Sequence, residues 1–285
     1  DDAAILRPTG LPLVWAVDTL VENTHFLRDM PPDQIGWKSL AVNLSDLAAM
    51  NAQPLAALLS LTLPPDLPDS WSEAFFSGLA RACNVYRVDL AGGDSVRGQE
   101  IQISLSVLGQ SAAPVTRTGA RAGDLLVVSG AFGGAAAGLH CFRQGLDEPG
   151  LLARHWHPLP RFEAAAALAE YCPRLAMLDT SDGLARSLQL ICEANGLGCQ
   201  VEGQRIPVEA GLDAVADPAR VLDWVLNGGE DYELLAAVPP ETRDLITAAA
   251  GLTIIGQLLA EPAMHIHYPD RVLDLALGQW GFQHF

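Results

Sequence analysis

Aspartate residues close several short apolar segments of this chain, and they limit the folds that it can adopt. Asp18 ends an apolar run that begins at residue 13, Asp179 follows another at 175–178, and Asp46 lies inside an otherwise apolar helical segment. An isolated, ionised carboxylate is costly to bury without a partner. The fold must therefore bring these carboxylates to places where a positively charged partner can reach them.

Strand and helix patterns alternate in the first half of the chain. Apolar runs at 13–18, 55–63 and 88–91 read as strands, and residues 101–107 alternate between apolar and polar side chains as a half-buried strand does. The apolar spacing at 33–50 predicts a helix. A Ser70-x-x-Glu73 capping box predicts a second helix that ends near residue 84. These patterns indicate an α/β fold.

The pattern breaks at residues 111–114, and a new strand begins near Asp124 after a glycine-rich turn. We therefore expect two domains, at 1–114 and 115–285. In the second domain, helices are predicted at 161–171 and 183–195, and strands at 199–201, 234–238 and 252–255. The whole chain of 285 residues is thus predicted to be a two-domain α/β protein.

The charge balance restricts the possible ligands. The chain has 34 acidic and 17 basic residues, which gives a net charge of −17 and disfavours binding to nucleic acid or an anionic membrane. No apolar run is long enough to span a bilayer and the first residues lack a signal sequence, so we expect a cytoplasmic protein. A phosphorylated ligand would need divalent cations or a few local arginines, and the placement of the aspartates favours cations.

Five cysteines are scattered through the chain and none are spaced as Cys-x-x-Cys. This argues against both a disulfide framework and a zinc site, and it predicts reduced cysteines in the core. The single lysine, Lys38, does not belong to a phosphate-binding P-loop. Protein-kinase, zinc-protease and serine-hydrolase motifs are also missing from the sequence.

Asp46 is the most informative single carboxylate. It lies three residues after Asn43, so both side chains share one helix face. Mg²⁺ prefers oxygen ligands and is often held by one or two carboxylates plus substrate phosphates. The alternative is an exposed polar stripe on an amphipathic helix.

Two further acidic segments follow predicted strands. Gly92-Gly93-Asp94 allows close approach of a ligand to the backbone, although a tight turn with a solvated aspartate explains the same pattern. Residues 179–184 (DTSDGL) offer carboxylates, hydroxyls and the amides of a helix N-terminus, which bind phosphate. Capping of that helix by Ser181 or Asp182 is the alternative.

Weaker signals lie elsewhere. The acidic turn at 228–233 could accept hydrogen bonds from a cationic or amine-bearing substrate, or it could be an ordinary loop. The small residues at 133–138 could admit a phosphate, although helix packing explains them as well. Arg117 is a candidate phosphate contact or a surface arginine, and His25 could be a structural histidine.

Taken together, several segments resemble thiamine-monophosphate kinases, which belong to a superfamily with aminoimidazole ribonucleotide synthetase and selenophosphate synthetase. They occur in the family's order across essentially the whole chain. The matching segments are DDAAIL (1–6), VDTLVENTHF (17–26), KSLAVNLSDLAAM (38–50), AGGDSVRG (91–98), TRTGARAGD (116–124), DTSDGL (179–184), GGEDYEL (228–234) and WGFQHF (280–285).

This resemblance implies an N-terminal mixed sheet with helices, which pairs in a homodimer, and a C-terminal α/β sandwich-like domain that completes the phosphate and substrate site. The expected reaction is transfer of the γ-phosphoryl group of ATP to thiamine monophosphate, assisted by several Mg²⁺ ions.

The resemblance also assigns residue roles. The implied Mg²⁺ ligands are Asp2, Asp18, Asp46, Asp94, Asp179 and Asp182, of which Asp46 and Asp182 are the catalytic ones. The implied ATP contacts are Gly93, Asp94, Arg117 and Ser181. The implied contacts to thiamine monophosphate are His25, Glu230 and Phe282.

The chain departs from the family pattern at a few positions. Ala16-Val17 replaces the usual Ser-Thr, which removes a hydroxyl ligand, and Asn51 and Phe76 replace a usual glycine and tyrosine. The chain also begins inside the family's GDD motif, so we expect that an N-terminal segment precedes it. Two alternatives remain: another ATP-using member of the superfamily, and a non-catalytic protein that binds thiamine phosphate or nucleotide.

Overall fold

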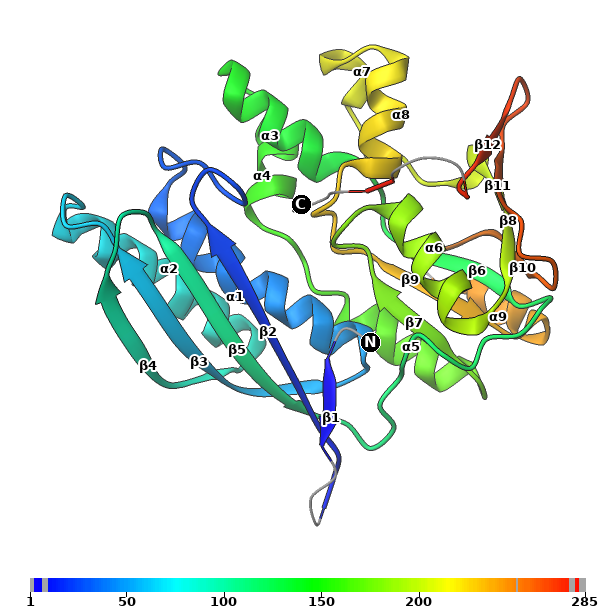
Figure 1. Cartoon of the computed structure of the whole chain (residues 1–285), viewed down its shortest axis with the longest axis horizontal. Coiled ribbons are helices and arrows are strands. Elements are labelled where there is room, and N and C mark those ends of the chain that lie inside the picture. Colours follow the sequence, from blue (N-terminus) through cyan, green and yellow to red (C-terminus); the bar gives the residue numbers. More distant parts are fainter. Residues whose placement is uncertain (1–2, 7–9, 250, 277–279, 282–285) are drawn as a thin grey trace. The chain divides into compact units, whose positions relative to one another are not determined.

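The computed structural model describes residues 3–6, 10–249, 251–276 and 280–281 (Figure 1). Its contacts divide the chain into two compact units. One comprises residues 2–48 and 52–114, and the other comprises residues 49–51 and 115–285. Both units combine helices with a mixed β-sheet, so the predicted mixed α/β fold class is confirmed.

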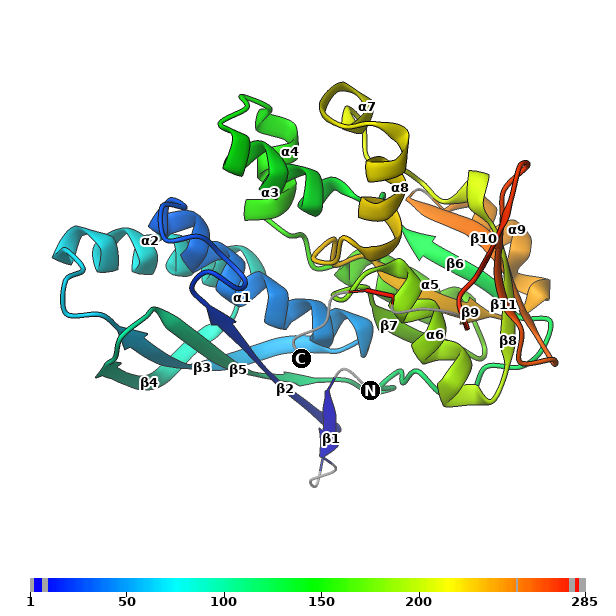
Figure 2. The ribbon, with the colours of Figure 1, turned by 45° about the horizontal axis from the view of Figure 1, so that its top comes forward.

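The N-terminal unit is a sheet of five strands with two helices. The strands are β1 (Ala4–Leu6), β2 (Leu13–Val21), β3 (Gln53–Leu63), β4 (Asp89–Arg97) and β5 (Gln102–Gln110), in the spatial order β1-β2-β5-β3-β4. Only β3 and β4 pair in parallel. Helices α1 (Pro32–Ala49) and α2 (Asp69–Tyr86) lie on the same face of this sheet (Figure 2).

Strand β5 shows why only one face is covered. Ile103, Leu105 and Val107 are buried, whereas Ser104 and Ser106 between them are half-buried. Side chains alternate between the two faces of a strand, so the apolar set faces the helices and the serines face away from them. The period-2 pattern therefore correctly identified the strand and its buried face.

Two local predictions in this unit are wrong. Strand β4 does not end at Gly92-Gly93 but continues to Arg97, and its pairing with β3 shifts register between Ala57 and Leu58. A Cβ atom on Gly93 would lie 1.9 Å from the carbonyl oxygen of Leu59, so the missing side chain keeps the two strands paired.

The predicted capping box at Ser70 is also not formed. Helix α2 begins at Asp69, and Pro68 takes the N-cap position without a side-chain hydrogen bond. The backbone N–H of Trp71 donates to the Pro68 carbonyl at 2.9 Å. With Pro68 at the N-cap, this helix starts two residues earlier than it would with Ser70 as the cap.

The C-terminal unit contains a sheet of seven strands, in the spatial order β12-β11-β8-β10-β6-β9-β7. Its strands are β6 (Leu125–Ser129), β7 (Ala176–Asp179), β8 (Gly198–Glu202), β9 (Leu234–Val238), β10 (Leu252–Leu259), β11 (Met264–His267) and β12 (Val272–Asp274). Its helices are α3 (Gly134–Gln144), α4 (Pro149–Trp156), α5 (Phe162–Tyr171), α6 (Leu184–Asn195), α7 (Leu212–Val215), α8 (Pro218–Asn227) and α9 (Arg243–Ala248), with short 3₁₀ turns η1 (Gly203–Arg205) and η2 (Pro240–Thr242).

Strand β6 lies between two apolar layers of this unit. Leu126 and Val128 pack with residues of α3, α6 and α8, whereas Leu125 and Val127 pack with residues of α5 and α9. Every residue of β6 is buried, as expected for a strand covered on both faces. The unit is therefore a sheet with helices on both sides.

All five cysteines are free; Cys141, Cys172, Cys192 and Cys199 are buried, as predicted for core residues, whereas Cys83 is half-buried. In the described part of the chain, no helix has both the length and the hydrophobicity that a membrane span requires.

We expect Leu126→Ala to lower the free energy of unfolding by about 2 to 5 kcal/mol, because it leaves a cavity in the apolar layer between β6 and its helices. Leu159→Ala is the control, since Leu159 is 44% exposed, and it should cost less than about 0.5 kcal/mol. Urea denaturation followed by circular dichroism measures both values. Similar losses for the two variants would contradict this account of the core.

Candidate functional site

Asp18 and Asp46 both belong to the N-terminal unit. Asn43 contacts the backbone of Asp18 and lies one helical turn before Asp46. The backbone N–H of Asp18, in β2, donates to Oδ1 of Asn43 at 2.9 Å, and Nδ2 of Asn43 donates to the carbonyl of Ser39. Asn43 is buried, whereas Asp46 is partly exposed one turn later on α1. The α1 residues directly before and after Asp46 are buried, so Asp46 is not part of an exposed polar stripe.

His25 is held in the turn that follows β2. Its Nδ1 accepts a hydrogen bond from the backbone N–H of Val21 at 3.0 Å, so a neutral ring carries its proton on Nε2. The carbonyl of His25 accepts from Nζ of Lys38, which is fully buried on α1. Lys38 therefore contributes to the position of the His25 backbone.

Gly93 and Asp94 lie within β4 rather than in a turn. Asp94 is exposed, its Oδ1 accepts from the backbone N–H of Ser95 at 2.9 Å, and it pairs with Ser60 across the sheet. The carboxylate is thus accessible and lies on a strand, which orients it more firmly than a free turn would.

Asp179 is the last residue of β7, and a short turn leads from it into α6. Asp179 is buried, and its Oδ1 accepts from the hydroxyl of Ser181 at 3.1 Å. Helix α6 begins after Gly183, which takes the N-cap position at φ 98° without a side-chain cap. The alternative that Ser181 or Asp182 simply caps this helix is therefore wrong.

The two acidic segments of the C-terminal unit are bound to each other. The N–H and hydroxyl of Thr180 both donate to the Glu233 carbonyl, at 2.9 and 3.1 Å. The backbone N–H of Glu230 donates to the Ser181 carbonyl at 2.7 Å. The structure thus brings Asp179, Ser181 and Asp182 next to the turn that carries Glu230.

This second turn has unusual backbone geometry. Gly229, Glu230 and Tyr232 have φ values of 66°, 58° and 51°. Positive φ is uncommon for residues other than glycine and costs of order 1 to 3 kcal/mol at each position. Surrounding contacts must therefore hold the turn in this conformation.

Asp231 supplies one of these contacts. Its carboxylate accepts backbone hydrogen bonds from Gly133 at 2.7 Å and from Ala135 at 3.0 Å, at the N-terminus of α3. Burial raises the pKa of Asp231 to about 7, against the opposing effects of these two bonds and of Arg154. The small residues at 133–138 therefore receive a carboxylate of the protein itself, which favours helix packing over a phosphate site there.

Glu233 supplies the second contact. It is fully buried and forms ion pairs with Arg154 and Arg161, and it accepts a hydrogen bond from the Ser129 hydroxyl at 2.6 Å. Arg154 also pairs with Glu209 at 2.8 Å. A buried carboxylate with two arginine partners fixes the start of β9 and so the end of the turn.

Glu230 itself is partly exposed. Its Oε2 lies 3.5 Å from Nδ1 of His155, which is buried on α4. The Glu230 side chain therefore packs against α4 and is 25% exposed.

Arg117 lies at the other end of β7. Its carbonyl accepts from Nδ2 of Asn195 at 2.9 Å, and the neighbouring Thr116 bridges to Ala176, the first residue of β7. The backbone of Arg117 is therefore separated from Asp179 by the length of this strand. Asp2 and Phe282, the other sequence-predicted site residues, lie outside the described residues.

The donor atoms of these segments are oxygens of carboxylates, hydroxyls and an amide, and such hard donors fit Mg²⁺. Among the residues that the structure describes, no three His, Cys, Asp or Glu side chains form a group that could hold a metal ion. Mg²⁺ commonly keeps several waters and uses substrate phosphates as ligands, so one or two carboxylates are enough to hold it.

Sequence reasoning missed the residues that support the 228–233 turn. Asp231 and Glu233 belong to a recognised acidic segment, but they face inward and anchor it, whereas Glu230 is partly exposed. Arg154 and Arg161 carry no motif. Arg161 begins a predicted helix, but no local pattern links either arginine to Glu233.

Comparison with known proteins gives consistent matches. Residues 1–111 match the family described as "AIR synthase related protein, N-terminal domain". Thiamine-monophosphate kinase of Escherichia coli strain K12 is 38% identical over 92% of this chain and 83% of its own length. The Synechococcus elongatus thiamine-monophosphate kinase is 36% identical over 100% of this chain and 90% of its own length.

Solved structures agree with these relatives. The structure described as AaThiL complexed with AMPPCP and TMP is 32% identical, with a TM-score of 0.85 over 93% of this chain and 87% of that chain. The Stenotrophomonas maltophilia thiamine-monophosphate kinase is 33% identical, with a TM-score of 0.84 over 93% and 89%. The E. coli hydrogenase maturation protein HypE, at 20% identity and a TM-score of 0.77, shares the fold.

We expect Glu233→Gln to lower the free energy of unfolding by about 3 kcal/mol or more, because it leaves two largely buried arginines without their shared carboxylate. Glu209→Gln is the matched control: Glu209 pairs with Arg154 alone and is 24% exposed, so its loss should be below about 1 kcal/mol. Chemical denaturation measures both. An equal cost for the two variants would show that Glu233 does not anchor the turn.

Proposed function

The chain belongs to the thiamine-monophosphate kinase family and is therefore an enzyme, and we propose that it transfers the γ-phosphoryl group of ATP to thiamine monophosphate. The products are thiamine diphosphate and ADP. The observation that carries this proposal is the pairing of the acidic segment 179–183 with the strained turn at 229–232, together with kinase relatives that match nearly the whole chain.

In the proposed reaction, an oxygen of the acceptor phosphate attacks the γ-phosphorus in line. The bond from that phosphorus to the oxygen bridging the β- and γ-phosphates breaks, and ADP leaves with both electrons of that bond. The acceptor oxygen is already ionised, so no protein base is required. Catalysis then consists mainly of positioning and charge neutralisation.

We assign the metal ligands to both units: Asp18, Asp46 and Asp94 in the first, Asp179 and Asp182 in the second, and Asp2 outside the described residues. Bound Mg²⁺ would offset the repulsion between the two phosphorylated substrates. Asp46 and Asp182 are the proposed catalytic carboxylates. The oxygen donors fit this role, and a protein with net charge −17 needs such cations to bind two anions.

The remaining site residues are assigned to contacts with ATP or with thiamine monophosphate. Gly93, Asp94, Arg117 and Ser181 are proposed to contact ATP. For thiamine monophosphate, Glu230 accepts hydrogen bonds from the substrate and His25 donates through Nε2, since its Nδ1 accepts from Val21. Phe282 is proposed to contact the same substrate. The anchored turn restricts the orientations of Glu230, which reduces the entropy lost when substrate binds.

The test is an ADP-release assay with ATP, Mg²⁺ and thiamine monophosphate, with chromatographic detection of thiamine diphosphate. We expect product from thiamine monophosphate and none from unphosphorylated thiamine or from an aminoimidazole-pathway substrate. ATP binding without this product would contradict the proposal and indicate a superfamily relative or a binding protein.

Within this assay, Asp46→Asn should lower kcat by at least about a hundredfold, since it removes a charge that holds the metal, while the circular dichroism spectrum stays unchanged. Asp147→Asn is the control, because Asp147 is an exposed loop carboxylate, and its kcat should stay within about twofold. Normal turnover by folded Asp46→Asn would exclude the proposed role.

We also propose that the chain forms a homodimer through the uncovered face of its N-terminal sheet. Trp15 and Val17 of β2 are 47% and 63% exposed, and Leu58 of β3 is 49% exposed. Contiguous exposed apolar residues on a sheet commonly mark an interface. Val17 stands at one of the two positions where the family has hydroxyl residues, and it adds to this apolar surface.

Val17→Arg should shift the protein from dimer toward monomer, because it places a charge in the proposed apolar interface. Val85→Arg on α2 is the matched control, since Val85 is 62% exposed but lies on the helical side. Sedimentation velocity at micromolar concentration measures both. An unchanged dimer in Val17→Arg, or a monomeric wild type, would contradict this interface.

A further inference from the structure

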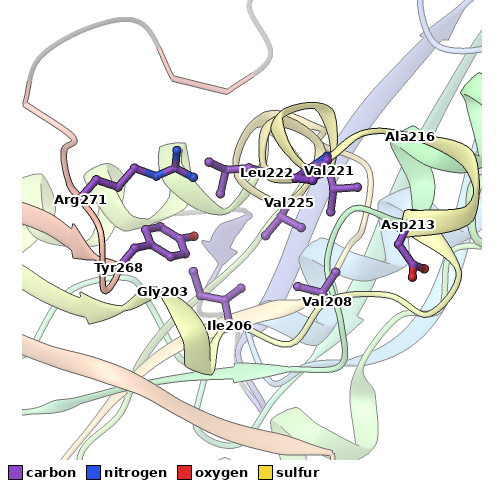
Figure 3. Close-up of a pocket in the computed structure, with 11 residues that line it drawn as sticks. Gly203, Ile206, Val208, Asp213, Ala216, Val221, Leu222, Val225, Tyr268 and Arg271 are labelled. Carbon is purple, nitrogen blue, oxygen red and sulfur yellow. The ribbon is translucent and has the colours of Figure 1, made fainter.

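A cavity of about 400 Å³ lies within the C-terminal unit, and none of the site residues assigned above is among those that line it (Figure 3). It is bounded by η1 and the segment that follows it, by α7 and α8, and by the turn between β11 and β12. Its walls include Ile206, Val208, Val221, Leu222 and Val225. Its size and apolar lining are those of pockets that bind small molecules.

One end of the cavity is aromatic and cationic. Tyr268 packs flat on Gly203, where a Cβ atom would lie 2.4 Å from the ring. The Arg271 guanidinium lies 5.5 Å from the centre of the Tyr268 ring, and backbone hydrogen bonds between these two residues close the β11–β12 turn. Figure 3 shows the Tyr268 hydroxyl and the Arg271 guanidinium directed into the cavity from the same side.

Arg271 differs from the arginines that stabilise this unit. Arg154, Arg161 and Arg174 each pair with a buried carboxylate. Within the described ranges, Arg271 forms no ion pair, and its guanidinium lies over the Tyr268 ring. In a chain with twice as many acidic as basic residues, an arginine without a carboxylate beside an apolar cavity is available to an external anion.

Asp213, at the opposite end of the cavity in Figure 3, is exposed to solvent. It disfavours a ligand with negative charge at both ends. The side chains between the two ends are apolar and offer neither hydrogen-bond donors nor acceptors to a sugar or a nucleotide. The ligand must therefore place its single anionic group beside Arg271 and an apolar body along α8.

From these features we propose that the cavity binds a small molecule that joins an aromatic or other apolar body to one anionic group, such as an aromatic carboxylate. The body lies against Val221, Leu222 and Tyr268, and the anion pairs with Arg271. This site is separate from the proposed kinase site and does not depend on it.

Anilinonaphthalene sulfonate is a suitable probe, because it has an aromatic body and one anionic group. Phenylnaphthylamine has nearly the same body without the sulfonate and reports the contribution of the charge. Fluorescence titrations of the full chain are made with saturating ATP, Mg²⁺ and thiamine monophosphate present, so that the proposed kinase site is occupied. We expect one saturable site per chain that prefers the sulfonate.

Three variants locate that site. Arg271→Gln should weaken sulfonate binding about tenfold and leave phenylnaphthylamine binding unchanged, because only the anion contact is lost. Val221→Trp should weaken both probes, because it fills the cavity. Arg143→Gln, which removes an exposed arginine at the end of α3, is the control and should change neither.

Sulfonate binding that is unaffected by both Arg271→Gln and Val221→Trp would overturn the proposal, as would the lack of saturable binding by wild type. Denaturation curves establish that each variant is folded. Kinase turnover should be the same in wild type and Arg271→Gln, so a failure of this site and a failure of the proposed function give different results.

Discussion

The C-terminal unit depends most on the interactions of the buried Glu233 carboxylate. Its side chain joins β9 to β6 through Ser129 and to the helical segments through Arg154 and Arg161, while its backbone joins β9 to the end of β7 through Thr180. A buried carboxylate is tolerated only when such partners compensate for its lost hydration. Removing the Glu233 carboxylate therefore breaks its links to β6 and to both helical segments at once.

This anchoring explains how the 229–232 turn keeps an unfavourable backbone. Asp231 binds the α3 N-terminus on one side of Tyr232, and Glu233 binds its arginines on the other. Two residues with positive φ each cost of order 1 to 3 kcal/mol, and the two anchors offset that cost. Glu230 directly precedes these anchors and is partly exposed, so the strained turn fixes the position of a side chain at the surface.

Periodic patterns predicted the elements whose environment is simple. The alternating strand β5 and the fully apolar strand β9 were located from residue order alone, because each has a uniform set of neighbours. The predicted end of strand β4 is too early, because a glycine pair is also typical of a turn. Only the close approach of Leu59 to Gly93 shows why glycine is needed within the strand. Helix α8 was missed although Asp217 and Pro218 form a good N-terminus. Which acidic residues face inward depends on long-range pairing, as for Glu233, and no local pattern encodes it.

The arginines of this chain divide into those that stabilise the fold and those that are available to bind a ligand. With 17 basic residues against 34 acidic ones, the buried arginines are taken up by carboxylates such as Glu233 and Asp124. These paired arginines are not available to phosphorylated substrates, which agrees with the proposal that metal ions at the aspartates offset the charge of those substrates. Arg271 forms no ion pair within the described residues, so its guanidinium keeps its capacity to bind an anion.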